Sequence, residues 1–111
     1  MDIQTTQYKR CTVVEMSGRI DSHSAPELKK AFEAITGEDK FKIVFDMNAV
    51  NFISSRGVWV LIETQKECKR YNRGLLVLAN VNDKIMDSLD LAGLQDFFKI
   101  YPNVTDAVGS F

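Results

Sequence analysis

Two short, almost wholly apolar runs constrain the fold of this chain more than any other feature. They are F-K-I-V-F-D at Phe41–Asp46 and L-L-V-L-A at Leu75–Ala79. Each has the length of a strand, and an apolar run without alternation predicts a strand covered on both faces, as in a parallel sheet. Between them, apolar residues keep helical spacing from Val58 to Cys68, until the turn at 72–74 ends the pattern. This strand–helix–strand unit predicts an α/β fold with helices packed on a parallel or mixed sheet.

The segment before the first apolar run begins with a predicted hairpin. Residues 2–8 and 11–16 look like two strands joined at Lys9 and Arg10. In the second strand, apolar side chains fall on both alternating faces, which predicts that both faces are at least partly covered. Gly18 then breaks the run and is expected to end this strand.

A helix is predicted next, with a distinct start, apolar face and end. Ser24 and Glu27 have the spacing of a capping box, in which the serine hydroxyl accepts a free backbone N–H and the glutamate reaches back. Gly37 supplies the expected stop. The residues between them that share one helix face are apolar: Leu28, Ala31, Phe32 and Ile35.

The rest of the chain predicts two more helices and a last strand. Asn82 or Asp83 can cap a helix whose core side chains are expected to be Ile85, Met86, Leu89 and Leu91. Residues 97–101 look like a strand and residues 104–108 like a short closing helix. The resulting order, β-β-α-β-α-β-α-β-α, predicts a single α/β domain over residues 1–111. Its sheet would be mixed or mostly parallel, with four to five strands and about four helices packed against it.

Composition argues against several classes of function. With 14 basic and 15 acidic residues, the chain has a net charge of -1, which supplies no electrostatic attraction for nucleic acid. Cys11 and Cys68 stand far apart beside a single histidine, so no Cys/His zinc set is available, and no metal or cofactor is expected. No apolar run approaches the ~18 residues of a membrane span, so no direct membrane insertion is expected. Without a recognisable secretion signal, the chain is expected to be cytoplasmic, with two reduced thiols rather than a disulfide.

The segment N-F-I-S-S-R-G-V-W at 51–59 places two hydroxyls, an arginine and a glycine between apolar runs. Ser54 or Ser55 could cap the following helix, act as a nucleophile or carry a modification. A serine in the first turn of a helix lies beside unsatisfied backbone N–H groups and the positive end of the helix dipole. A phosphate on Ser55 would therefore place a charge of about -1.5 to -2 in a favourable position. Arg56 could add a charge-assisted hydrogen bond. Capping by Ser54 and modification of Ser55 are compatible.

The order of elements, with S-S-x-G opening a helix just after the strand Phe41–Asp46, resembles the STAS family, the sulfate-transporter and anti-sigma-factor-antagonist domains. The resemblance covers essentially the whole chain and rests on the order and spacing of several short pieces. These pieces are S-G-R-I-D at 17–21, A-P-E-L at 25–28, V-F-D at 44–46, V-N-F-I-S-S-R-G-V at 50–58 and L-A-G-L at 91–94.

The resemblance implies a site as well as a fold. In the anti-sigma-factor antagonists, a partner that is both an anti-sigma factor and a serine kinase phosphorylates the serine two places before the glycine, and the matching residue is Ser55. Ser54 stands where the family usually has an acidic or small polar residue, and Asp21 matches an aspartate that commonly neighbours the phosphosite. Arg56 departs from the pattern, because the family usually has Ser or Ala there. The residues expected beside the site are Ser22, His23, Gly57 and Trp59.

The implied activity is a protein-binding switch rather than an enzyme. Unphosphorylated, the domain would bind the anti-sigma factor and so free a sigma factor. Phosphorylated at Ser55, it would release that partner, and a serine phosphatase would reset it. ATP would be the kinase's cofactor, and this chain would need none.

Two other functions compete with this interpretation. Ser55–Gly57 supplies the second half of a G-x-S-x-G nucleophile elbow, and His23 and Asp21 could complete a Ser/His/Asp set. Ile53 stands where the first glycine belongs, and a lone histidine beside a helix start is far more often a surface or capping residue, so catalysis is not expected. Some stand-alone STAS domains are instead accessory subunits of membrane transporters for lipids or anions, acting by protein contact without a phosphoserine. That alternative stays open.

The second helix carries two further surface features. Trp59 lies one residue off the apolar stripe, so it would be an interface anchor if exposed and part of the core if buried. Glu63 and Glu67 lie among basic residues that fall on one stripe and could dock an acidic partner or an anionic lipid headgroup. The mixture of signs favours a solvated outer face instead. The stripe consists of Lys66, Lys69, Arg70 and Arg73.

Overall fold

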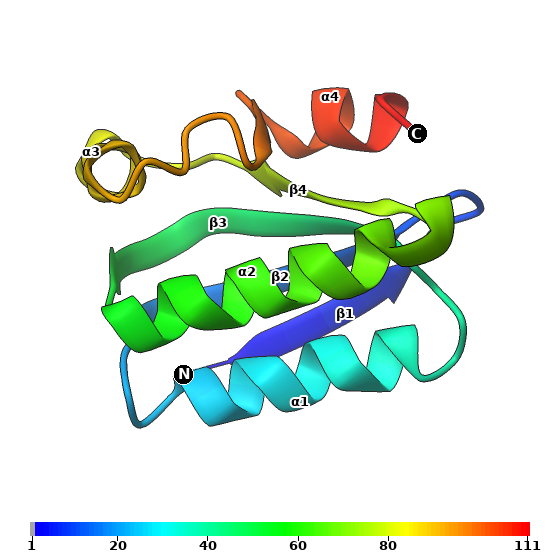
Figure 1. Cartoon of the computed structure of the whole chain (residues 1–111), viewed down its shortest axis with the longest axis horizontal. Coiled ribbons are helices and arrows are strands. Elements are labelled where there is room, and N and C mark those ends of the chain that lie inside the picture. The colour runs from blue at the N-terminus through cyan, green and yellow to red at the C-terminus, as the bar shows by residue number, and fades with distance from the viewer. Residues whose placement is uncertain (1) are drawn as a thin grey trace.

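The alternation of strands and helices is present in the structure, a computed structural model that describes residues 2–111 (Figure 1). Its strands form one sheet in the order β1-β2-β3-β4-β5, in which β1 pairs antiparallel with β2 and all other pairs are parallel. The predicted α/β fold with a mixed, mostly parallel sheet and four α-helices is confirmed for these residues. The elements are β1 (Ile3–Gln7), β2 (Thr12–Ile20), α1 (Ala25–Thr36), β3 (Lys42–Ile53), α2 (Ser55–Lys69), β4 (Leu75–Ala79), α3 (Asp83–Leu91), β5 (Lys99–Tyr101) and α4 (Val104–Gly109), with a 3₁₀ turn at Arg70–Asn72.

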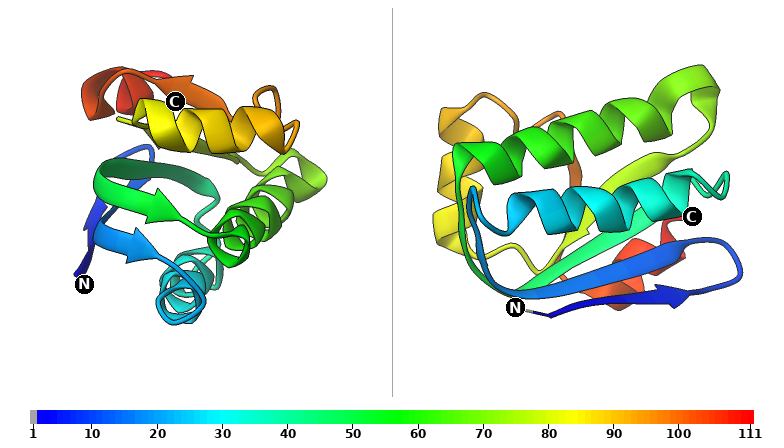
Figure 2. Two further views of the ribbon diagram at one scale, coloured as in Figure 1. Left: turned by 90° about the vertical axis from the view of Figure 1, so that its left-hand side faces the viewer. Right: turned by 90° about the horizontal axis from the view of Figure 1, so that it is seen from below.

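The main core lies between one face of the sheet and the helices α1, α2 and α3 (Figures 1 and 2). Helix α1 contributes the apolar face that its spacing predicts, and Gly37 caps its C-terminus as expected. The two central strands β3 and β4 contribute alternate side chains to this core, and their other side chains face the opposite way. Large side chains that are wholly buried in it include Phe32, Phe45, Ile43, Leu61, Leu76 and Leu78.

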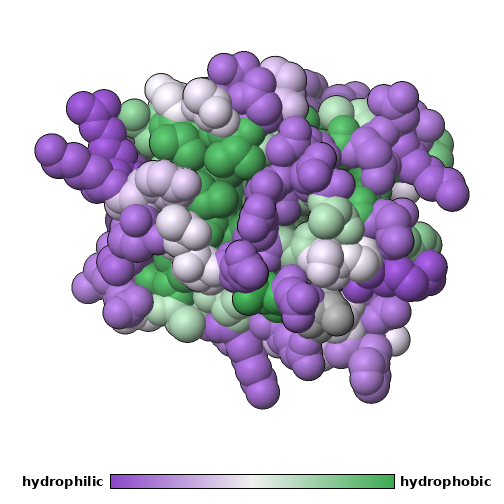
Figure 3. All heavy atoms as spheres, turned by 180° about the vertical axis from the view of Figure 1, so that it is seen from behind, coloured by the Kyte–Doolittle hydropathy of each residue, from purple (hydrophilic) through white to green (hydrophobic). Residues whose placement is uncertain are grey.

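A smaller apolar cluster lies on the opposite face of the sheet, against α4. Strand side chains Val13, Val44 and Val77 pack there with Ala107 of α4. In the view from behind, the widest apolar area lies at upper left, and smaller apolar areas elsewhere are separated from it by hydrophilic residues (Figure 3). The apolar runs Phe41–Asp46 and Leu75–Ala79 therefore lie in strands that are covered on both faces, which explains why they do not alternate.

One polar side chain is wholly buried in the main core. Gln65 of α2 has no exposed surface. Its amide nitrogen donates to the carbonyl oxygens of Leu76 at 3.0 Å and Phe97 at 3.1 Å, and its amide oxygen accepts from the Leu76 N–H at 2.8 Å. Strand β5 pairs with β4 only from Val77 onward. Gln65 thus supplies the hydrogen bonds that a neighbouring strand would otherwise give to Leu76.

Several predicted boundaries were wrong. Gly18 does not end the second strand, because β2 continues to Ile20, and Gly18 instead adopts a positive φ of 93° at a register shift between β2 and β3. The strand expected at Phe41–Asp46 continues to Ile53. Leu91 is not a core residue: it ends α3 with 90% of its surface exposed.

Candidate functional site

The candidate site is formed where β2 and β3 end side by side. These strands are parallel and pair Ile20 with Ile53, so the loops that follow them leave the same edge of the sheet. The Ser54 N–H donates to the Ile20 carbonyl oxygen at 2.7 Å. The segment Asp21–Ser24 and the start of α2, which are far apart in sequence, are therefore held together by the backbone.

Ser54 and Ser55 have different roles in the structure. Ser54 is the N-cap of α2, in an extended conformation, and its hydroxyl oxygen accepts from the Gly57 N–H at 3.3 Å. Its carbonyl oxygen accepts the first helical bond from Val58 at 3.0 Å. Ser55 is the first residue of α2 and is exposed. The cap predicted for Ser54 is confirmed, and the Ser55 hydroxyl is accessible at the positive end of the helix dipole.

Gly57 allows α2 to begin close to the strand ends. A Cβ atom at this position would lie 2.5 Å from Cγ2 of Ile20 and 2.7 Å from Cγ1 of Ile53, both closer than van der Waals contact permits. Gly57 is buried, and both isoleucines are core residues. The glycine in the S-S-R-G segment is therefore required by packing, and it fixes how close the two serines lie to the end of the sheet.

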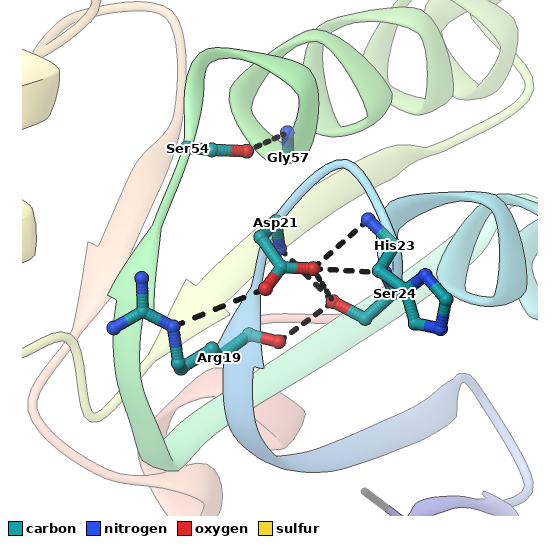
Figure 4. Close-up of polar contacts among 6 residues, drawn as sticks. All are labelled: Arg19, Asp21, His23, Ser24, Ser54 and Gly57. Carbon is teal, nitrogen blue, oxygen red and sulfur yellow. Dashed lines mark hydrogen bonds and ion pairs between the residues drawn. The ribbon is translucent and has the colours of Figure 1, made fainter.

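Asp21 organises the loop that leads into α1 (Figure 4). Its Oδ1 accepts from the backbone N–H groups of His23 at 2.9 Å and Ser24 at 3.0 Å. The bond from the Ser24 N–H, followed by the bond from the His23 N–H, contributes most to holding the pKa of the Asp21 carboxyl below its ordinary value. The charge of Arg19 contributes less. Asp21 thus carries a negative charge beside the start of α2 at neutral pH.

The predicted capping box at the start of α1 was wrong. The Ser24 hydroxyl makes no bond to a helix N–H; it donates to the Arg19 carbonyl oxygen at 2.6 Å and accepts from the Asp21 N–H at 2.9 Å. The Ser24 N–H, which Glu27 was expected to reach, bonds to Asp21 instead. Asp21 therefore takes the place that the capping box would give to Glu27 as acceptor for the Ser24 N–H.

His23 does not join the serines in a catalytic arrangement. Its imidazole points away from Ser54 in Figure 4, and its backbone N–H is the group that contacts Asp21. Ser22 and His23 are both exposed. The residues predicted as neighbours of the site therefore lie on adjoining loops, but the histidine, the aspartate and Ser55 do not form the hydrogen-bonded chain that a serine nucleophile needs.

Comparison with known proteins identifies the fold family. A family model described as STAS domain matches residues 2–107. The chain belongs to the STAS family. The predicted resemblance is thereby confirmed, and the S-S-x-G segment lies at the start of α2 within the matched residues.

Similar STAS proteins include regulators of sigma factors. The anti-sigma-B factor antagonist of Listeria monocytogenes is 27% identical over 85 residues, which are 77% of this chain and 74% of that protein. The crystal structure of an anti-sigma factor antagonist from Mycobacterium paratuberculosis superposes with a TM-score of 0.88 at 27% identity, covering 98% of this chain and 92% of the other. The phosphorylated form of the Bacillus cell fate determinant SpoIIAA has a TM-score of 0.77 at 15% identity, covering 98% of each chain, which shows a shared fold.

Two residues of this STAS domain stand out on the surface near the site. Arg56 is exposed, and none of the four ion pairs among residues 2–111 involves it. Trp59 is 54% exposed, so it belongs to the surface rather than the core. Because residues four apart lie on the same helix face, Trp59 is the neighbour of Ser55 one turn further along α2. The accessible hydroxyl is thus next to a large exposed aromatic ring.

One pair beside the site was missed in the sequence. Arg19 of β2 and Phe52 of β3 are paired across the strands, and the guanidinium carbon of Arg19 lies 4.1 Å from the centre of the Phe52 ring. The Phe52 side chain is 37% exposed. Arg19 also lies 3.9 Å from the Asp21 carboxylate. Alternation along the strands places both residues outward, but their contact depends on a register that contains two irregularities.

The basic stripe, which runs from the end of α2 into the following turn, is only partly offset by acidic residues, because Glu63 pairs with Lys29 of α1 instead. Arg70 and Arg73 both approach the Glu67 carboxylate, at 3.4 Å and 3.5 Å. Lys66 lies 5.9 Å from the centre of the Trp59 ring. Within residues 2–111, no helix is long and apolar enough to cross a membrane, and no cluster of three metal-ligating side chains occurs.

Proposed function

We propose that this STAS domain is an anti-sigma factor antagonist, and that phosphorylation of Ser55 controls its binding to an anti-sigma factor that is also a serine kinase. The observation that carries the proposal is the exposed Ser55 hydroxyl at the first position of α2, one turn from the exposed Trp59. The names of the similar proteins from Listeria and Mycobacterium support the antagonist role. The phosphorylated form of SpoIIAA supports control by phosphate in a protein of this fold.

A phosphate on Ser55 is compatible with the fold. Ser55 makes no side-chain hydrogen bond that modification would break among the described residues, since the cap of α2 is supplied by Ser54. The helix N-terminus favours a negative charge, and the exposed Arg56 can supply a charge-assisted hydrogen bond. Modification therefore changes the charge and bulk of the surface while leaving the domain folded.

The effect on a partner follows from the same geometry. Trp59 follows Ser55 by one turn on α2, and the exposed Ser22 and His23 lie on the loop that is tied to the start of α2, so a partner can cover these residues together. A partner packed over them would have to desolvate the phosphate, which costs several kcal/mol. Because each ~1.4 kcal/mol changes affinity tenfold, one phosphate is enough to release the partner. A serine phosphatase that removes it restores the binding surface.

The test uses a kinase-type anti-sigma factor from the same organism, sought first among the genes that adjoin this one. Incubation with that protein and ATP, followed by mass mapping, is expected to place one phosphate on Ser55. The phosphate is expected to disappear in Ser55→Ala and to remain in Ser54→Ala. Phosphate on Ser54 alone would contradict the assignment. No phosphate on either serine with any cognate kinase would contradict the switch and favour the role of transporter accessory subunit.

Binding measurements test the second half of the proposal. Titration calorimetry is expected to show at least a hundredfold weaker binding for Ser55→Glu than for the unmodified domain. Thr105→Glu is the matched control, because Thr105 is exposed on α4, which packs on the opposite face of the sheet from α2. Equal loss of affinity in both variants would show that net charge, rather than the Ser55 site, controls binding.

A further inference from the structure

The two edges of the sheet are protected very differently. Strand β5 forms one edge and has only three residues, one of which is Lys99. Strand β1 forms the other edge with five residues, I-Q-T-T-Q, that include no charge and no proline. Figure 2 shows β1 along the border of the sheet with no further element beside it. Edge strands usually carry charges, prolines or bulges that prevent pairing with another chain, and β1 has none of these.

The register of β1 shows which backbone groups are free. The Tyr8 N–H donates to the Cys11 carbonyl, and the Ser17 N–H donates to the Asp2 carbonyl, so even-numbered residues of β1 bond to β2. In an antiparallel pair the bonded residues alternate, so the N–H and C=O groups of Ile3, Thr5 and Gln7 point away from the sheet. The outer edge of β1 therefore presents three residues with a free donor and a free acceptor each.

We propose that β1 pairs with β1 of a second copy of this chain, antiparallel and centred on Thr5. In that register Thr5 faces Thr5 of the other copy and Ile3 faces Gln7, so each of the three outward-facing residues exchanges two hydrogen bonds with its opposite residue. The two copies are related by a twofold axis and their sheets join into one. The arrangement is closed, because each copy uses its β1 edge once.

Charge selects the antiparallel arrangement. Asp2 lies at one end of β1, and Lys9 and Arg10 lie at the other, in the hairpin turn, and all three are exposed. Antiparallel pairing places the Asp2 end of each copy beside the Lys9 and Arg10 end of the other, whereas parallel pairing would place like charges together. A strand with no charge of its own and complementary charges at its ends fits a second copy of itself.

Sedimentation equilibrium of the wild-type chain from about 10 μM to 1 mM tests the pairing, since a small edge-to-edge interface gives a concentration-dependent dimer. Thr5→Pro removes one outward N–H from each copy, and with it both central hydrogen bonds, but leaves the bonds of β1 to β2 in place. We expect its dimer dissociation constant to be at least tenfold higher. A thermal unfolding curve like that of the wild type shows that the variant still folds.

Two cysteine variants test the pairing by cross-linking, independently of Thr5→Pro. Opposite residues that exchange hydrogen bonds have Cα atoms about 5.5 Å apart, which a disulfide can span, so Thr5→Cys is expected to give a covalent dimer on mild oxidation. Gln4→Cys is the matched control, because Gln4 is also exposed but would face Thr6 of the other copy, out of reach of its own counterpart. The native thiols of Cys11 and Cys68 are buried. A monomer at every concentration would overturn the proposal and would leave the β1 edge open to a strand of a different protein. Equal cross-linking of Thr5→Cys and Gln4→Cys would also overturn it.

Discussion

Substitution of Gly57 by alanine tests whether close packing at the start of α2 is required. The added methyl group would lie 2.5 Å from Ile20 and 2.7 Å from Ile53, so both side chains or the helix itself would have to move. Ile20 has no exposed surface and Ile53 only 7%, which leaves little room for either to shift. Overpacking of this kind typically costs about 1–3 kcal/mol.

The higher helix propensity of alanine partly offsets this loss of stability. Alanine is favoured over glycine in a helix by about 1 kcal/mol, so part of the packing cost is offset. Because two contacts this short place the packing cost in the upper part of that range, about 2–3 kcal/mol, we expect Gly57→Ala to lower the free energy of unfolding by about 1–2 kcal/mol, a fall in Tm of at least about 4 °C for a domain of this size. Urea unfolding followed by circular dichroism, together with a thermal melt, measures both quantities.

Gly109→Ala is the matched control for this measurement. Gly109 is also helical, at the end of α4, but a Cβ atom there meets nothing within 4 Å. Its replacement is expected to leave stability unchanged or slightly higher. In an Ile20→Ala background, the cost of Gly57→Ala should shrink, because the closest opposing atom is gone. If Gly57→Ala proves as stable as the wild type, the packing argument for this glycine is refuted.

Three further substitutions test separate parts of the structure. Ser54→Ala removes the cap of α2 and should cost about 1 kcal/mol in urea unfolding, whereas an unchanged midpoint would show that the bond to its hydroxyl contributes nothing. The pKa of Asp21 is lower in the folded state, so its charge stabilises the fold above the unfolded pKa of about 3.9, and this stabilisation is lost as pH falls through the lower folded value. Asp21→Asn keeps an oxygen acceptor and should flatten the acid side of the stability curve; an unaltered acid limb contradicts this. Gln65→Leu should lower stability by about 3 kcal/mol, measured by urea unfolding, because two buried backbone groups of Leu76 and the partly buried Phe97 carbonyl lose their partner. An equally stable leucine variant would show that water replaces the amide.

Periodicity was sufficient to predict the order of elements but not where each one ends. Helices show an apolar period of 3.6, whereas strands show either alternation or a short continuous apolar run, so every strand and α-helix of residues 2–111 was located. The end of β3 was not predicted, because Asn48, Ala49 and Asn51 interrupt its apolar run. Those residues remain in the strand because the parallel ladder with β2 continues beside them to Ile53. Pairing between distant segments thus overrides local polarity.

The candidate site was predictable to the extent that its contacts are local. The cap by Ser54 joins residues three apart, and spacing alone indicates it. The role of Ser24 was mispredicted, because its N–H and its hydroxyl bond to residues that precede it in the chain. The N–H bonds to the Asp21 carboxylate and the hydroxyl to the Arg19 carbonyl. The contact between Arg19 and Phe52 depends on the register of two strands, which a single sequence does not define.

The buried amide of Gln65 has a consequence for how this domain can signal. It joins the middle of α2 to the backbone of β4 and to the segment before β5. If α2 slid along the sheet, the two buried backbone groups of Leu76 would lose their partner at about 1–3 kcal/mol each, more than a charge at the helix N-terminus contributes. This cost opposes the relay of a chemical change at the first turn of α2 as a sliding of the helix. Such a change would act on the surface around that turn, where a molecule in direct contact can detect it.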